Sequence, residues 1–184
     1  MQVDLSRFKN SWYKTGRGFG IRGAWYILNC LFFKSSLVHS SLLKTVLLCF
    51  FGAKIGKGVV LKPSINVKYP WNLEVGNNSW IGECVWLDSL APITIGHNCC
   101  LSQGAYICTG NHDWSDPAFS LIVKPIIIED GAWIGAKAVV LPGVTISTHS
   151  VVTAGSVISK TTQPYTIYCG NPAVPIKTRT IKSE

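Results

Sequence analysis

The residue best suited to acid–base chemistry is His112, which lies in the segment TGNHDWSDP (residues 109–117). Imidazole titrates near neutral pH, so a histidine that is held in place can remove a proton from an attacking hydroxyl group. A loop histidine that only caps a turn is the alternative interpretation. Four carboxylates could orient the imidazole, and the sequence does not choose among them: Asp88, Asp113, Asp116 and Glu83.

The other histidines and the cysteines predict no metal site. His39, His97 and His149 are expected on the surface, whereas a catalytic zinc needs three protein ligands that converge. The seven cysteines form no C-x-x-C pair and no zinc spacing, so reduced, buried thiols in the cytosol are expected.

An aliphatic residue recurs at every sixth position over most of the chain. The period is unbroken from Ile128 onward and returns upstream in three triplets. All fifteen positions are Ile, Leu or Val: Ile55, Leu61, Val67, Val75, Ile81, Leu87, Ile95, Leu101, Ile107, Ile128, Ile134, Val140, Ile146, Val152 and Ile158. Four positions after the hit, twelve of the fifteen positions are Ser, Thr, Ala, Val or Cys, and glycine follows directly at five hits, where a tight corner could need a permissive backbone.

This period predicts a stacked triangular prism, in which each hexad turns one corner and neighbouring coils bond to one another. We expect about five coils over residues 53–163, interrupted once by an extruded loop at 113–127. Loops on a rigid scaffold are common places for catalytic groups, and this one begins directly after His112. Residues 1–52 form an N-terminal segment, and residues 164–184 form a C-terminal tail.

The N-terminal segment contains a predicted amphipathic helix over residues 40–51, with Ser40 or Ser41 as its N-cap. Its apolar stripe comprises Leu42, Leu43, Val46, Leu47 and Phe50. A similar apolar segment, residues 24–33, precedes it. Two interpretations stay open: helices that cover the open end of the prism, or a basic amphipathic surface for peripheral membrane contact.

The net charge of +8 is concentrated at the two ends of the chain. Residues 1–51 carry seven Lys or Arg against one acid, and residues 160–184 carry four against one, while the middle is neutral. No nucleic-acid-binding motif accompanies these charges, so they favour a phosphorylated cofactor or an anionic membrane surface over nucleic acid. Residues 1–10 lack the pattern of a secretory signal, so a cytoplasmic protein is expected, with the inner face of the membrane as the alternative location.

The I-G-x-x-x-x hexads, together with AWIGAKAVVLPGV, TAGSVISK and YTIYCGNPAVPIKTR, resemble the hexapeptide-repeat acyltransferases over about residues 55–173. The resemblance implies an all-β, left-handed parallel β-helix with an N-terminal helical segment, assembled as a homotrimer with active sites between chains. It implies acetyl-CoA as co-substrate and direct transfer to a hydroxyl with His112 as general base. The implied cofactor contacts are Trp133, Ala136, Ala154, Lys160 and Lys177.

The basic N-terminal segment before GAKIGKGV, with VWLDSLAPITIG, LSQGAYI and TGNHDWSDP, is most similar to the colanic acid biosynthesis acetyltransferases. This implies O-acetylation of a nucleotide-linked or lipid-linked sugar in exopolysaccharide biosynthesis, with acceptor contacts expected at Asp88, Cys84 and Asn111. The more distant galactoside and maltose O-acetyltransferases carry an acceptor-binding asparagine where this chain has Cys84, so their acceptor does not carry over. Two alternatives stay open: another small acceptor, such as serine or an antibiotic, and a non-catalytic β-helix that only binds its ligand.

Overall fold

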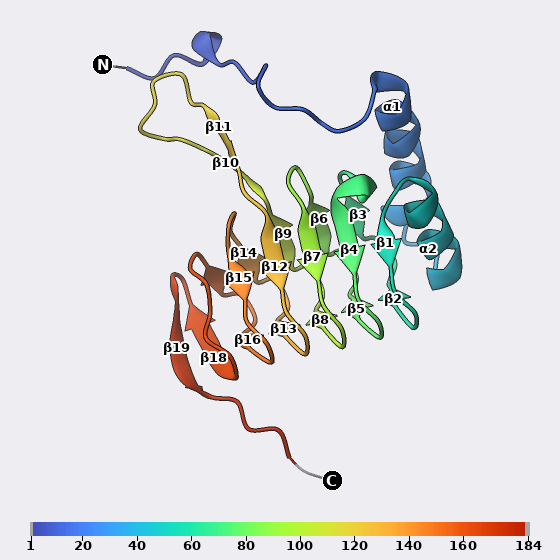
Figure 1. Ribbon diagram of the computed structural model, residues 1–184, viewed down its shortest axis with the longest axis vertical. Coiled ribbons are helices and arrows are strands. Elements are labelled where there is room, and N and C mark those ends of the chain that lie inside the picture. Colours follow the sequence, from blue (N-terminus) through green and yellow to red (C-terminus); the bar gives the residue numbers. More distant parts are fainter. Residues whose placement is uncertain (1, 183–184) are drawn as a thin grey trace.

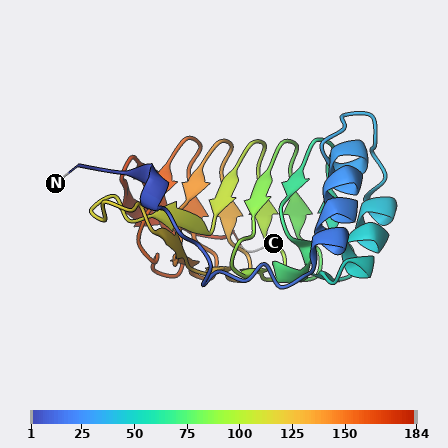
Figure 2. The same cartoon turned by 90° about the horizontal axis from the view of Figure 1, so that it is seen from above.

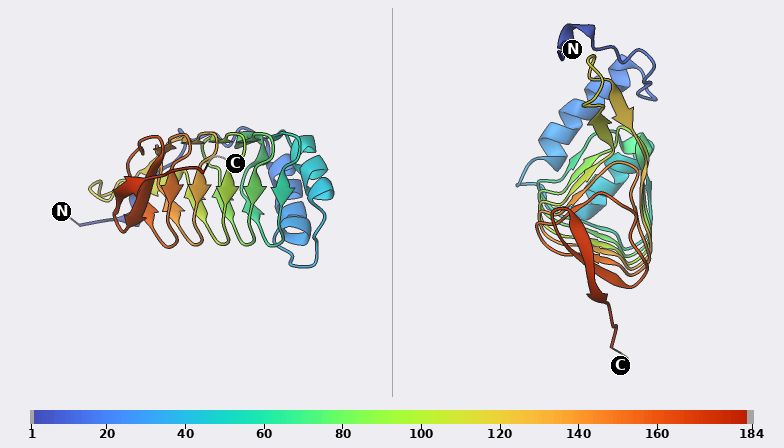
Figure 3. Two further views of the ribbon diagram at one scale, coloured as in Figure 1. Left: turned by 90° about the horizontal axis from the view of Figure 1, so that it is seen from below. Right: turned by 90° about the vertical axis from the view of Figure 1, so that its left-hand side faces the viewer.

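The computed structural model describes residues 2–182. From residue 54 to residue 170 the chain winds into a triangular prism with a sheet of stacked parallel strands on each side (Figures 1 and 3). Sheet A stacks β1 (Lys54–Ile55), β4 (Leu73–Val75), β7 (Ile93–Ile95), β12 (Ile126–Ile128) and β15 (Thr145–Ile146). Sheet B stacks β2 (Val60–Leu61), β5 (Trp80–Ile81), β8 (Cys100–Leu101), β13 (Trp133–Ile134), β16 (Val151–Val152) and β18 (Thr166–Gly170), and β19 (Ala173–Thr178) pairs antiparallel with β18 at its edge. Sheet C stacks β3 (Asn66–Val67), β6 (Trp86–Asp88), β9 (Tyr106–Cys108), β14 (Val139–Val140) and β17 (Val157–Ile158). The strands form five complete coils and, with β18, the start of a sixth, so the predicted left-handed parallel β-helix is confirmed.

The hexad positions line the interior of the prism. Fourteen of the fifteen are buried, and only Ile55, in the first strand, is partly exposed. Each pairs with an equivalent residue in a neighbouring coil, as Val75 pairs with Ile95. Aliphatic side chains therefore stack in continuous ladders, and burial of each stabilises the fold by about 1.5–3 kcal/mol.

The glycines that directly follow the hexad residues have a different role from the predicted one. Backbones with positive φ lie three positions after the hexad residue, for example at Gly58 (φ +69°) and Gly104 (φ +68°). The glycines directly after the hexad residue have no positive φ, so the permissive backbone predicted for them is wrong. Their role is steric, because a Cβ on Gly135 would lie 2.5 Å from the backbone nitrogen of Ala154 in the next coil.

The N-terminal end of the prism is covered by two helices, α1 (Phe19–Leu28) and α2 (Ser41–Phe50) (Figures 1 and 2). A short π-helical turn, η2 (Asn29–Phe33), continues α1, and two 3-10 turns complete the elements: η1 (Leu5–Arg7) and η3 (Pro70–Asn72). The Ser40 hydroxyl accepts a hydrogen bond from Leu43 N at 3.2 Å, so Ser40 is the N-cap of α2.

Side chains of this helical cap bond to the first coil, which has no preceding coil to pair with. Trp25 Nε1 donates to Val67 O at 2.9 Å, and Lys44 Nζ donates to Lys62 O at 2.8 Å. Ser41 Oγ bonds to both peptide groups of Leu61, as donor to the carbonyl at 3.2 Å and as acceptor from the N–H at 3.0 Å. The cap thus satisfies peptide groups that would otherwise form an open sheet edge.

The cap packs through a different face of α2 from the predicted apolar stripe. Lys44 and Leu48 are completely buried, whereas Leu42 and Phe50 are 75% and 82% exposed. Leu43 and Val46 are also exposed, so α2 covers the prism end and at the same time turns four stripe residues outward.

The excursion from the third coil is a β-hairpin rather than an irregular loop. Strand β10 (Gly110–His112) pairs antiparallel with β11 (Leu121–Val123), and His112 lies opposite Leu121. The excursion therefore begins at Gly110, before the predicted position 113, because the strand that carries His112 is itself part of it. Figure 3 shows the hairpin projecting from one corner of the prism, away from the β18–β19 hairpin at the C-terminal end.

Candidate active site

His112 is held by a backbone carbonyl of its own hairpin. Its Nδ1 lies 2.8 Å from Phe119 O. A carbonyl oxygen can only accept a hydrogen bond, so Nδ1 carries the proton in the neutral imidazole. Nε2 is then the ring nitrogen with a free lone pair, which is the state required of a general base.

Aromatic rings fix the plane of the imidazole. Phe119 stacks on His112 with ring centroids 4.4 Å apart, and Phe8 approaches it at 5.6 Å. A cavity of about 250 Å³ beside the ring is lined by Leu5, Phe8, His112 and Phe119. The N-terminal segment that supplies Leu5 and Phe8 is tied to the hairpin by Asp4 N, which donates to Pro117 O at 2.9 Å. The first residues of the chain therefore lie over the histidine.

No carboxylate contacts the imidazole within residues 2–182, so the expectation of an orienting carboxylate is wrong. Asp113 accepts hydrogen bonds from Ser115, and Asp116 accepts them from Ser120 and Ala118 N. These hydrogen bonds hold the pKa of both carboxyl groups below the usual range. Asp116 also accepts Phe119 N through its backbone carbonyl, so the aspartates shape the turn that presents Phe119 O.

Asp88 belongs to a buried polar cluster at the base of the hairpin. Its Oδ1 lies 3.3 Å from Lys68 Nζ, and its Oδ2 accepts a hydrogen bond from the Tyr106 hydroxyl at 3.1 Å. Burial, with hydrogen bonding to Cys108 and the nearby Asp88 charge, raises the pKa of Tyr106. Burial also raises the pKa of Tyr13 to about 12, with Tyr69 and Asp88 adding to the effect. Both phenols are therefore hydrogen-bond donors at neutral pH.

The predicted acceptor residues lie at two different corners of the prism. Asn111 is exposed next to His112, and Asp88 ends strand β6 at the same corner, between sheets C and A. Cys84 is exposed at the corner between sheets B and C, with φ +58°. One chain therefore brings Asp88 and Asn111 to the His112 corner and leaves Cys84 at another.

The predicted cofactor residues lie mainly on sheet B and at the corner between sheets B and C. Trp133 is 46% exposed in β13, and its Nε1 donates to Ser102 Oγ at 2.9 Å. Ala136 and Ala154 stack at one corner, where Gly155 N donates to Ala136 O at 2.8 Å. Lys177 is exposed in β19, which joins sheet B, whereas Lys160 is exposed after β17 at the His112 corner. Most of this group is thus separated from His112 by the width of sheet C.

The remaining histidines have structural contacts. His97 Nδ1 accepts from Asn77 N at 2.8 Å, His149 stacks on Tyr165 at 4.8 Å, and His39 is exposed. No three His, Cys, Asp or Glu side chains cluster as metal ligands in the described part of the chain.

Three residues at the histidine were missed by the sequence reasoning: Leu5, Phe8 and Phe119. All lie outside the hexad pattern, and the first two are more than one hundred residues from His112 in sequence. The available signal was three apolar residues, Val3, Leu5 and Phe8, among the otherwise polar residues 2–10.

Comparison with known proteins places this geometry in a family. The model of the bacterial transferase hexapeptide (six repeats) matches residues 125–160. The chain is 43% identical over 136 residues to WcaF of Escherichia coli (strain K12), named a colanic acid biosynthesis acetyltransferase, covering 74% of this chain and 75% of the relative. It is 27% identical over 132 residues to the galactoside O-acetyltransferase of the same strain, covering 68% and 63% of the two chains.

A solved structure extends the match over the whole prism. The hexapeptide-repeat-containing acetyltransferase VCA0836 of Vibrio cholerae, complexed with acetyl-CoA, superposes with a TM-score of 0.79 at 26% identity and covers 88% of each chain. With its stacked hexads, its hairpin histidine and these relatives, the chain belongs to the hexapeptide-repeat acetyltransferases.

Proposed function

We propose that this enzyme transfers the acetyl group of acetyl-CoA to a sugar hydroxyl in exopolysaccharide biosynthesis, with His112 as the general base. The observation that carries the proposal is the 2.8 Å contact between His112 Nδ1 and Phe119 O, because it leaves Nε2 free to accept a proton. The acceptor class is supported by the similarity to WcaF, which is named for colanic acid biosynthesis.

The proposed reaction is direct transfer. His112 Nε2 accepts the proton of the acceptor hydroxyl while its oxygen bonds to the thioester carbonyl carbon. The tetrahedral intermediate then collapses, the carbon–sulfur bond breaks, and the thiolate of coenzyme A takes the proton back from the imidazolium. No acyl-enzyme is needed, which agrees with Cys108, whose Sγ is engaged with Gly110 O at 2.9 Å.

The donor is proposed to lie along the stacked corner at Ala136 and Ala154. Small side chains at this corner leave room for an extended pantetheine arm, and Trp133 borders it on sheet B. Lys160 and Lys177 are exposed and can neutralise nucleotide phosphates.

Because Ala136 and Ala154 lie at a different corner from His112, one chain offers two half-sites. A homotrimer would bring the His112 corner of one chain against the donor corner of the next. This arrangement supports our proposal that the active site forms between subunits.

The test is coenzyme A release from acetyl-CoA with mono- and oligosaccharides, serine and chloramphenicol as acceptors. We expect turnover with sugars, and a loss of about a thousandfold or more in His112→Ala with retained acetyl-CoA binding. Equal turnover in His112→Ala would remove its role as base. Turnover only with serine or chloramphenicol would replace the sugar by another small acceptor, and acetyl-CoA binding without any turnover would favour a binding protein.

We also propose that the enzyme works in the cytoplasm, in peripheral contact with the inner face of the membrane through α2. No helix among residues 2–182 has the length and hydrophobicity to cross a bilayer. The outward face of α2, formed by Leu42, Leu43, Val46 and Phe50, carries no charge, and the only lysine of the helix is buried behind it. Apart from buried Lys44, the chain up to residue 62 carries nine basic residues against Asp4, which complements an anionic lipid surface: Arg7, Lys9, Lys14, Arg17, Arg22, Lys34, Lys54, Lys57 and Lys62.

Flotation with liposomes tests this contact. The full chain should float with vesicles that contain phosphatidylglycerol and far less with pure phosphatidylcholine. Leu42→Asp with Val46→Asp should abolish flotation, whereas Ile181→Asp, an equally apolar exposed position far from the cap, should not. Flotation that is unchanged by the α2 pair would contradict the proposal.

A further inference from the structure

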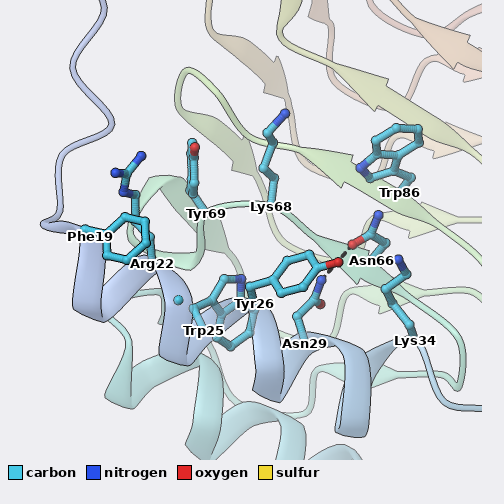
Figure 4. Close-up of a pocket in the computed structure, with 11 residues that line it drawn as sticks. Phe19, Arg22, Trp25, Tyr26, Asn29, Lys34, Asn66, Lys68, Tyr69 and Trp86 are labelled. Carbon is cyan, nitrogen blue, oxygen red and sulfur yellow. Dashed lines mark hydrogen bonds between the residues drawn. The ribbon is translucent and has the colours of Figure 1, made fainter.

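A second concave site lies between α1 and the first two coils. Its volume is about 390 Å³, and Figure 4 shows α1 side chains on one wall and side chains of coils 1 and 2 on the other. We call it the aromatic groove and define it by Arg22, Tyr26, Lys34, Asn66, Lys68 and Trp86. None of these residues belongs to the proposed base or donor contacts.

The groove is walled by exposed aromatic rings. Tyr26 on α1 is 68% exposed, and Trp86 on β6 is 40% exposed. Trp86 is held in place by stacking on Tyr106, with ring centroids 4.6 Å apart. Flat aromatic faces with a polar edge suit the C–H faces of a sugar ring, since they offer apolar contact area at low entropic cost.

Cations line the same groove, and most of their charge is not compensated. Lys68 pairs with Asp88 at 3.3 Å, but Arg22 and Lys34 have no acidic partner among residues 2–182. Arg22 Nε is buried without a hydrogen-bond acceptor there, and its guanidinium lies 5.9 Å from the Phe19 ring centre. A buried donor without a partner is costly, so an anionic ligand that accepts from Arg22 would relieve this cost.

The floor of the groove is rigid. Asn29 Nδ2 donates to Asn66 Oδ1 at 2.8 Å, and Asn29 Oδ1 accepts from Val67 N at 3.3 Å. These bonds fix the start of η2, which continues α1, against strand β3. They also leave no hydrogen bond from Asn66 Nδ2 within the described chain, so this amide can donate to a ligand hydroxyl.

The groove also shares an edge of the prism with His112. Lys68 follows β3 in the first coil, and the His112 hairpin follows β9 in the third coil, both at the corner between sheets C and A. Two coil spacings correspond to about 10 Å. Figure 1 shows α1 and the β10–β11 hairpin along this same side of the molecule.

We infer that the aromatic groove binds the phosphorylated end of the sugar acceptor. A sugar ring packs between Tyr26 and Trp86, and phosphoryl oxygens accept hydrogen bonds from the cation at either end of the groove, Arg22 at one end and Lys34 at the other (Figure 4). The inference rests on the proposed function and adds a substrate class to it: acceptors that carry a phosphoryl group next to a sugar. Nucleotide-linked and lipid-linked sugars share this chemistry.

Calorimetric titration of the full chain tests the inference. Glucose 1-phosphate should bind about tenfold or more tightly than glucose and than inorganic phosphate, because only it engages both the rings and the cations. Arg22→Gln with Lys34→Gln should remove this advantage, and Lys57→Gln, an exposed lysine outside the groove, should retain it. Equal affinity for the three probes, or equal losses in the groove and control variants, would overturn the inference.

Two further measurements distinguish a nucleotide-linked from a lipid-linked acceptor, and a failure of the groove assignment from a failure of the proposed function. Tighter binding of UDP-glucose would indicate a nucleotide-linked acceptor, and tighter binding of a polyprenyl phosphate in micelles would indicate a lipid-linked one. Glucose 1-phosphate should bind His112→Ala as it binds the wild type. If wild-type transfer to neutral sugars persists without any preference for glucose 1-phosphate, the groove assignment falls and the proposed function stands. If the preference holds but no sugar is acetylated, the proposed function falls instead.

Discussion

At the scale of single residues, the orientation of His112, the proposed base, by a carbonyl has a chemical consequence. A carboxylate would add a negative charge that stabilises imidazolium, whereas Phe119 O fixes the tautomer as a neutral acceptor. Phe119 itself has φ +54°, a backbone conformation that bulky residues rarely adopt. The hydrogen bonds of Asp116 to the turn hold this conformation, so Asp116 is a positioning residue for His112.

The Phe8 ring should matter for the rate more than for donor binding. Phe8→Ala removes one of the two rings that hold the imidazole, so we expect kcat to fall about ten- to a hundredfold with an unchanged KM for acetyl-CoA. Steady-state kinetics measure kcat and the KM for acetyl-CoA separately. Val3→Ala is the control, because Val3 is an exposed apolar residue in the same segment. An unchanged kcat would show that Phe8 only covers the hairpin.

At the scale of elements, the only charged side chain of α2 is buried, and four of the five residues of its predicted apolar stripe are exposed. Lys44 is buried because its ammonium donates a hydrogen bond to Lys62 O at the open edge of the first coil. The helical pattern in the sequence identified which residues share a face. It did not identify which face meets the prism, because that depends on the unpaired carbonyl of a strand eighteen residues away.

Lys44 predicts a specific pH dependence of stability. Burial lowers its pKa below the ordinary value of 10.5. Between these two values the unfolded chain binds the proton and the folded chain does not, so this lysine makes stability rise with pH across that window. The Tm of the wild type should therefore rise relative to that of Lys44→Met as the pH is raised from 7 toward 10.

Thermal denaturation at each pH measures this difference. Lys57→Met, which changes an exposed lysine, should run parallel to the wild type over the same range. Parallel curves for Lys44→Met as well would show that the ammonium is not destabilised by its site.

At the scale of the whole molecule, the separation of His112 from Ala136 and Ala154 predicts complementation between inactive variants. In the proposed homotrimer, His112→Ala and Ala154→Trp would each damage a different one of the two proposed half-sites, so trimers mixed at random from the two variants should recover about a quarter of wild-type activity. Activity after co-refolding measures this recovery, and light scattering checks for three chains. Two inactive variants that stay inactive when mixed would place the whole site within one chain.

The repeat made the prism predictable because the information is local and redundant. Each hexad places an aliphatic residue at the position that faces the interior, and fourteen of fifteen such positions are buried. The surroundings of His112 were not predictable in this way, since Phe8 reaches it across 104 positions and Phe119 through its main chain. Neither contact leaves a periodic trace, and side-chain chemistry alone pointed wrongly to a carboxylate.

The stacking of coils does not by itself limit their number, since the outermost coil, or rung, always exposes peptide groups that can pair with a further coil. In this protein, growth in one direction ends at Trp25, Asn29, Ser41 and Lys44, whose hydrogen bonds occupy the free peptide groups of the first rung. A chain whose helices detached would expose that rung to the final rung of another molecule. The N-terminal helices therefore also guard against end-to-end filament formation, and damage to them should appear as polymerisation before it appears as unfolding.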